Sequence, residues 1–178
     1  DKATPGTLHH FVPAPGDCVF LEANTVHAIG ANILLFEVQQ TSDTTYRLYD
    51  WDRVDAKTNR PRELHVDHGL ACSDFAKGPC GPVTPTPLPT SHPAERLVGC
   101  PYFTLDRHRH DAPFAVGELG ACRVVVGVDG AATLVYAGGQ TPVGVGSVVL
   151  LPASLGRVEV RPSGPVTLLE CGLPWTST

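Results

Sequence analysis

The chain lacks several features that would assign it to a common class of protein. Its 178 residues include no Met and only 3 Lys, and the formal net charge is −5. Without a basic block, the chain offers no electrostatic footprint for nucleic acid. The longest apolar runs fall far short of the ~20 residues that a bilayer-spanning helix needs. We therefore expect neither a nucleic-acid partner nor a membrane partner.

Disulfide signals are also missing. The six cysteines show no Cys-x-x-Cys spacing, and four of them lie within or beside apolar, strand-like runs. A chain of this length can bury a hydrophobic core without disulfide bonds. We therefore expect reduced thiols, as in cytosolic proteins.

Glycine and proline, by contrast, are abundant. The chain has 18 Gly and 17 Pro, together about a fifth of its residues, which excludes a helical bundle and predicts short strands with many turns. Six of the prolines fall in residues 78–93, where they favour an extended connector. This composition predicts a first domain over residues 1–77, a Pro-rich linker over 78–95 and a second domain over 96–178.

The hydrophobic pattern predicts a mainly all-β fold of the barrel or sandwich type. A short helix is expected within Arg62–Phe75, before the linker. The expected strands are Cys18–Glu22, Ile33–Gln39 and Thr45–Asp50 in the first domain, and Tyr102–Asp106, Cys122–Val128, Ala132–Tyr136, Ser147–Leu151, Val158–Val160 and Val166–Glu170 in the second.

The two halves share a repeated sequence frame. GDCVFLEANTVHAI begins at Gly16, and GSVVLLPASLGRVE begins at Gly146. In each copy a glycine opens a five-residue strand and a short turn follows, in which Asn24 fits because Asn tolerates positive φ. Eleven residues after the glycines stand His27 and Arg157. The frame resembles the second conserved motif of the cupin superfamily, whose members are antiparallel jelly-roll β-barrels that commonly bind a metal through this His.

Longer motifs narrow the resemblance. TVHAIG, EVQQTSDTTYRLYDWDR and PRELH follow one another between residues 25 and 65, and CPYFTLDR and VVLLPASLG lie in the second half. In this order they resemble the type I mannose-6-phosphate isomerases in their short bacterial form. The resemblance implies two cupin barrels, the first of them incomplete, and a cytoplasmic enzyme that interconverts mannose 6-phosphate and fructose 6-phosphate. With the absence of Met, it also leads us to expect that the front of the first barrel is missing.

The resemblance also implies the site residues. The family holds one zinc ion through a Gln, two His and a Glu, and only the later His has a counterpart here, His27; the other ligands are expected upstream of residue 1. The family's active-site acids and arginine correspond to Glu37, Asp43 and Arg47. Isomerisation passes through an enediolate, which Arg47 would stabilise while Asp43 and Glu37 orient it or the substrate. The pattern itself places Glu37 in an apolar strand, where its carboxylate would need a metal, an Arg or a ligand.

Other histidines are open to alternative interpretations. His65 and His68 have the spacing of a helical zinc pair, but no third ligand is evident, so surface residues are the simpler interpretation. His108 and His110 are similar to the first cupin motif without its Glu, and with Arg157 they indicate a second barrel that binds no metal. Two further functions stay open: a non-catalytic cupin module that binds a sugar or sugar phosphate, and a cupin oxygenase or epimerase.

Overall fold

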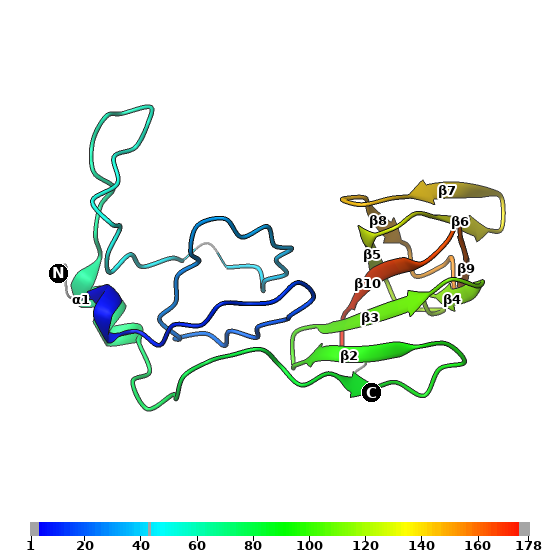
Figure 1. Cartoon of the computed structure of the whole chain (residues 1–178), viewed down its shortest axis with the longest axis horizontal. Coiled ribbons are helices and arrows are strands. Elements are labelled where there is room, and N and C mark those ends of the chain that lie inside the picture. The colour runs from blue at the N-terminus through cyan, green and yellow to red at the C-terminus, as the bar shows by residue number, and fades with distance from the viewer. Residues whose placement is uncertain (1–3, 43, 175–178) are drawn as a thin grey trace. The chain divides into compact units, whose positions relative to one another are not determined.

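The computed structural model of the chain describes residues 4–42 and 44–174. It divides into two compact units, Asp1–Pro82 and Val83–Thr178, which can be followed by colour in Figure 1. Their boundary lies inside the Pro-rich segment. That segment is more than a connector, because β1 (Thr86–Pro87) and the first residues of β2 (Ala94–Gly99) fall within 78–95.

The second unit consists of two antiparallel sheets. The six-stranded sheet has the order β1-β2-β3-β10-β5-β8, and the four-stranded sheet has the order β4-β9-β6-β7. Besides β1 and β2, the strands are β3 (Thr104–His110), β4 (Phe114–Val116), β5 (Arg123–Asp129), β6 (Ala132–Tyr136), β7 (Gly139–Val143), β8 (Val148–Leu151), β9 (Val158–Pro162) and β10 (Val166–Gly172). Together with a single short α-helix in the first unit, this gives a mainly antiparallel β fold, as predicted.

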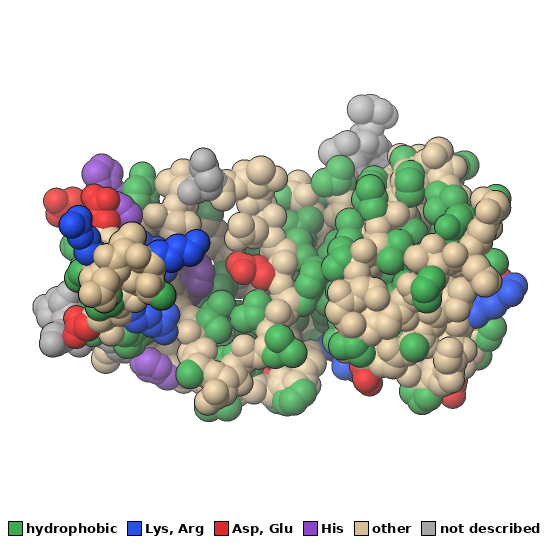
Figure 2. Space-filling view, turned by 90° about the horizontal axis from the view of Figure 1, so that it is seen from above, with side chains coloured by type: hydrophobic (Ala, Val, Ile, Leu, Met, Phe, Trp, Pro, Cys, Tyr) green, Lys and Arg blue, Asp and Glu red, His purple; other side chains and the backbone are tan. Residues whose placement is uncertain are grey.

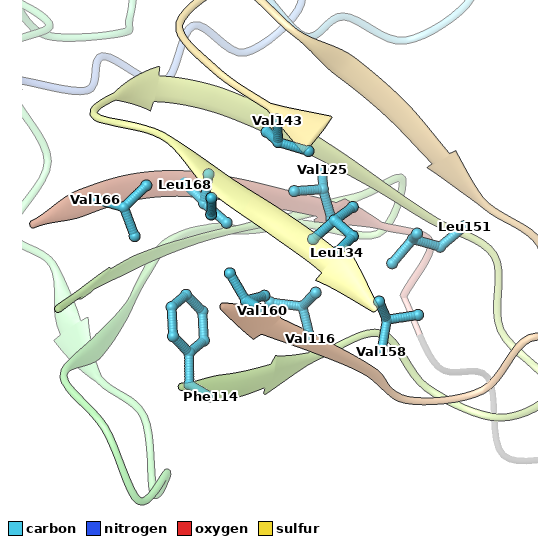
Figure 3. Close-up of a cluster of buried hydrophobic side chains, with 11 residues drawn as sticks. Phe114, Val116, Val125, Leu134, Val143, Leu151, Val158, Val160, Val166 and Leu168 are labelled. Carbon is cyan, nitrogen blue, oxygen red and sulfur yellow. The ribbon is translucent and has the colours of Figure 1, made fainter. Parts of the chain in front are cut away.

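A hydrophobic core lies between the two sheets (Figure 3). Both sheets contribute inward-facing side chains, among which Leu134 of β6, Val125 of β5 and Leu168 of β10 have no exposed surface. Buried residues alternate with more exposed ones along β6 and β9, which is the two-residue period of a sandwich, whereas β10 is buried along most of its length. Burial of these apolar side chains is the main stabilising contribution to the unit.

The six strands predicted in the second half are confirmed within a few residues, and Ala132–Tyr136 is reproduced at both ends. The repeated frame also has a structural counterpart, because Gly16 (φ 92°) and Gly146 (φ 81°) both adopt positive φ. Asn24 does the same at φ 70°, as its turn position predicted. These left-handed conformations favour Gly or Asn, which explains why those residues stand there.

The first unit differs from the prediction. Its described residues contain a 3₁₀ turn, η1 (Thr4–Thr7), and the helix α1 (Val66–Cys72), but none of the three expected strands, Cys18–Glu22, Ile33–Gln39 and Thr45–Asp50. The strand pattern is present, but a strand forms only where a neighbour takes up its backbone hydrogen bonds and covers its apolar face. Leu34 is fully exposed, and hydrophobic side chains reach the molecular surface in Figure 2. Among the described residues, these segments are paired only at single points, through an isolated bridge between Val19 and Pro82 and the hydrogen bond between His65 and Arg47, and no continuous ladder forms.

Two simpler expectations can be compared directly with the structure. All six cysteines carry free thiols, and Cys171 on β10 is buried. Within the described ranges, no helix has the length and apolarity required to cross a membrane.

Candidate active site

The helix α1 sets the position of the segment that carries Arg47. Gly69 is the buried residue of this short helix. A Cβ atom at that position would lie 2.5 Å from Cδ2 of Leu48. A larger residue at position 69 would require the Leu48 side chain to move, and α1 packs closely against the chain around Leu48.

Arg47 is fixed through its backbone as well as its side chain. His65 is the N-cap residue of α1, and its backbone N–H donates to the Arg47 carbonyl at 2.8 Å. The Arg47 N–H in turn donates to Nδ1 of His65 at 3.3 Å, which requires a lone pair on that ring nitrogen. Nη1 of Arg47 donates to the carbonyl of Glu63 at 3.3 Å. The side chain is 27% exposed, so part of its guanidinium faces solvent.

A buried carboxylate lies beside this arginine. Asp50 is 7% exposed and receives both Nε and Nη2 of Arg62, with 2.7 Å between Nε and Oδ2. Nε of Arg47 lies 3.9 Å from Oδ1 of the same carboxylate. The hydrogen bonds from Arg62 are the main reason why the pKa of Asp50 is lower than its ordinary value, so Asp50 is ionised at neutral pH.

His27, the predicted metal ligand, is exposed on the turn after Asn24. Its Nδ1 lies 2.8 Å from the carbonyl oxygen of Thr25. Because a carbonyl can only accept, Nδ1 carries the proton and the lone pair is on Nε2. This is the tautomer of a histidine that binds a metal through Nε2 while the other nitrogen donates to the backbone.

The remaining predicted site residues are not brought together with Arg47. Glu37 is exposed, so the expectation that its carboxylate would be buried in an apolar strand is wrong, because that strand does not form. Asp43 lies outside the described residues. Among the described residues, no hydrogen bond or ion pair connects His27, Glu37 and Arg47. No group of three metal-binding side chains occurs in that part of the chain either.

The His65 and His68 pair has a local role in this unit. The ring of Tyr46 lies 6.1 Å from the ring of His65 and 5.5 Å from that of His68, measured between centroids. Both histidines therefore pack on an aromatic ring beside Arg47. His68 is exposed, whereas His65 is partly buried and accepts the Arg47 N–H.

A second polar cluster is buried in the second unit. Nε2 of His92 lies 2.9 Å from Nδ1 of His108, and Nε2 of His108 lies 3.1 Å from a carboxylate oxygen of Glu170. The other carboxylate oxygen accepts the backbone N–H of Gly117 at 3.0 Å and lies 3.5 Å from Nε of Arg123. Since a carboxylate can only accept, His108 carries its proton on Nε2, and His92 donates to the free Nδ1. The contact between Nε2 of His108 and Glu170 is close but lacks hydrogen-bond geometry, and the other contacts give the cluster the character of a structural network.

Sequence reasoning predicted Arg47 but missed the roles of Asp50, Arg62 and His65 around it. Neither Asp50 nor Arg62 is among the predicted site residues. Both lie within or next to the motifs quoted above, but they are twelve residues apart. Without a predicted pairing of those two segments, no sequence signal joins them.

Comparisons with known proteins agree with these motifs. A comparison with models of known protein families finds no match. The mannose-6-phosphate isomerase ManA of Bacillus subtilis is 30% identical over 157 residues, which cover 83% of this chain and 46% of that protein. The mannose-6-phosphate isomerase of Streptococcus mutans is 33% identical over 127 residues, covering 64% of this chain and 39% of that protein.

A solved structure supports the fold. The crystal structure of the mannose 6-phosphate isomerase from Bacillus subtilis matches with a TM-score of 0.63 at 23% identity, over 73% of this chain and 40% of that one. The chain thus spans about half the length of the relatives it matches. The chain is therefore similar in sequence to about half of these mannose-6-phosphate isomerases, and the solved structure shows a common fold.

Proposed function

We propose that this chain belongs to a protein that acts as a mannose-6-phosphate isomerase and interconverts mannose 6-phosphate and fructose 6-phosphate. The observation that carries the proposal is the likeness to the Bacillus subtilis isomerase over 83% of the chain, which includes the segment around Arg47. Sugar phosphates are intracellular metabolites, so a cytoplasmic location follows from the proposed substrate.

Arg47 has the chemistry that the reaction needs. An aldose–ketose isomerase moves a proton between the first two carbons and stabilises the enediolate that forms between them. A guanidinium is permanently charged and donates several hydrogen bonds in one plane, so it suits both enediolate oxygens and a phosphate. In this proposal the partly exposed guanidinium of Arg47 donates to the substrate oxygens, and Asp43 and Glu37 orient the substrate.

A divalent metal such as zinc would act as a Lewis acid on the sugar carbonyl when bound. The tautomer of His27 suits one of its ligands, since Nε2 carries the lone pair on an exposed ring. Zinc takes four ligands, and the described residues hold no group of three candidate donors. We therefore propose that residues 1–178 alone bind zinc weakly and turn over little substrate.

A coupled assay of mannose 6-phosphate conversion tests the function. It is run on this chain and on any longer protein that contains it, with and without a chelator. Metal-dependent conversion by the longer protein is the expected result. Binding of mannose 6-phosphate by the longer protein without conversion would support the non-catalytic sugar-phosphate module instead, and conversion by that protein after full metal removal would rule out the metal-dependent mechanism.

A further inference from the structure

Asp50 stands out because a buried carboxylate is costly unless it is paired, and its partner Arg62 has a side chain that is 40% exposed. Asp50 is almost fully buried, and Arg62 covers both of its carboxylate oxygens in a fork. Both residues line a surface hollow of about 180 Å³. The pair lies beside Arg47, the residue to which the resemblance assigns the reaction chemistry.

The contacts of Arg47 leave part of its guanidinium available. Nη1 is engaged by the Glu63 carbonyl, and Nε is 3.9 Å from Oδ1 of Asp50. Among the described residues, Nη2 of Arg47 has no hydrogen bond or ion pair. A carboxylate and a guanidinium normally form a bidentate pair. Asp50 does not form one with Arg47, because Arg62 already occupies both carboxylate oxygens.

We propose that Asp50 and Arg62 are positioning residues, and that Arg62 keeps Asp50 from closing onto Arg47, so that the Arg47 guanidinium stays available to the oxygens of a sugar phosphate. For the identity of the ligand, this inference rests on the function proposed above. The positioning itself depends only on contacts within the chain.

The proposal makes an unusual prediction about a double variant. In Arg62→Ala, Asp50 loses its partner and takes up Arg47 as a bidentate pair, which occupies the donors that the ligand needs. Arg62→Ala combined with Asp50→Asn removes the competing charge, so Arg47 is available again. A merely structural pair would also regain stability in the double variant, because Asp50→Asn leaves no buried charge unpaired, but the Arg47 signal and the ligand affinity would not follow the two substitutions.

The experiment is a titration of the full chain with mannose 6-phosphate, followed by the side-chain Nε–H NMR signal of Arg47. We expect Arg62→Ala to weaken binding by about tenfold or more, which is the scale of one charge-assisted contact. The double variant should recover most of that loss. Arg53→Ala is the matched control, because Arg53 lies in the same hollow but packs over the Trp51 ring, 5.6 Å from its centroid. Its affinity should stay within about twofold of the unmodified chain.

The ligand-free spectra separate this proposal from the proposed function. The Arg47 signal should move in Arg62→Ala and return toward its original position in the double variant, whether or not mannose 6-phosphate binds. Arg62→Lys is a second variant, because the lysine ammonium can pair with only one oxygen of Asp50 at a time. In this variant the Arg47 signal should lie between its positions in the unmodified chain and in Arg62→Ala. An Arg47 signal that is unchanged in Arg62→Ala, or a double variant as displaced as the single one, would overturn the positioning role. Failure of the unmodified chain to bind mannose 6-phosphate, with the signal changes intact, would count against the proposed function alone.

Discussion

Replacing Glu170 by Gln is the sharpest test of the buried network in the second unit. Glu170 is 9% exposed, and its two oxygens together face three donors, Nε2 of His108, the Gly117 N–H and Nε of Arg123. Gln has nearly the same volume, so the substitution leaves no cavity. It replaces one acceptor by an NH₂ group that points a donor at a donor.

The expected loss can be worked from these contacts. One buried donor left without an acceptor costs about 1–3 kcal/mol. Arg123 keeps its ion pair with Glu118, so the loss of the Glu170 charge adds little to this cost. We therefore expect Glu170→Gln to lower the free energy of unfolding of the second unit by about 2 kcal/mol.

The assay is urea unfolding of the full chain followed by far-UV circular dichroism. Glu159→Gln is the matched control, because Glu159 pairs with Arg161 on β9 at 2.8 Å with both side chains largely in solvent. That exposed pair is expected to contribute less than about 1 kcal/mol. Equal losses for the two variants would refute the reasoning that burial makes the Glu170 contacts strong.

The pH dependence of the same variant has a defined sign. Although burial raises the pKa of Glu170, its contacts with His108, Gly117 and Arg123 outweigh this and hold the pKa below its ordinary value of 4.5. A lowered carboxyl pKa contributes stability above pH 4.5 that is lost as the pH falls through the folded-state value. The unmodified chain should therefore lose more stability than Glu170→Gln in that acid range.

Three further predictions concern the core, the buried histidine and the metal. Leu168→Ala should cost about 3 kcal/mol because Leu168 has no exposed surface, whereas Leu150→Ala, at a position 61% exposed, should cost less than about 1 kcal/mol in the same urea assay. Burial is the main cause that lowers the pKa of His92 below 6.5, so the chain should lose stability as the pH falls below 6.5. His92→Gln should lessen that loss between pH 7 and pH 5.5, measured by urea unfolding at both pH values. The exposed control His68→Gln should leave the loss unchanged. Equilibrium dialysis should show weak zinc binding that His27→Ala weakens further, and tight stoichiometric zinc in both forms would contradict the single-ligand assignment.

The sequence predicted the second unit well for a physical reason. Its strands are short runs rich in Val and Leu that are separated by Gly, Pro or Asp, and the strands that pair with them are in the same unit, so local pattern and tertiary structure agree. The exceptions have local causes. The strand β7 (Gly139–Val143) contains Pro142 and lies at a sheet edge, where proline is tolerated. Phe114–Val116 is too short to show a period, and Ala94–Gly99 begins within the expected linker.

The first unit shows the limit of the same reasoning. Residues 33–39 have the composition of a strand, but a strand also needs neighbours, and local pattern cannot supply them. The prediction of a buried Glu37 failed with the strand that was to bury it. Arg47 was predicted from its motif, whereas its fixation by Asp50, Arg62 and His65 depends on a pairing of two segments that no local pattern encodes. Motif residues are thus more predictable than the contacts that orient them.

The most direct test of the central claim is the turnover of mannose 6-phosphate by the protein that carries this chain, compared between Arg47→Ala and Arg60→Ala. Arg60 is exposed and is the matched control, because its recorded contact is a backbone hydrogen bond to Asp55. Loss of a donor to the developing enediolate charge should lower kcat by about 100-fold or more in Arg47→Ala, with Arg60→Ala unchanged. Equal turnover in the two variants would contradict the assignment of Arg47 to the reaction.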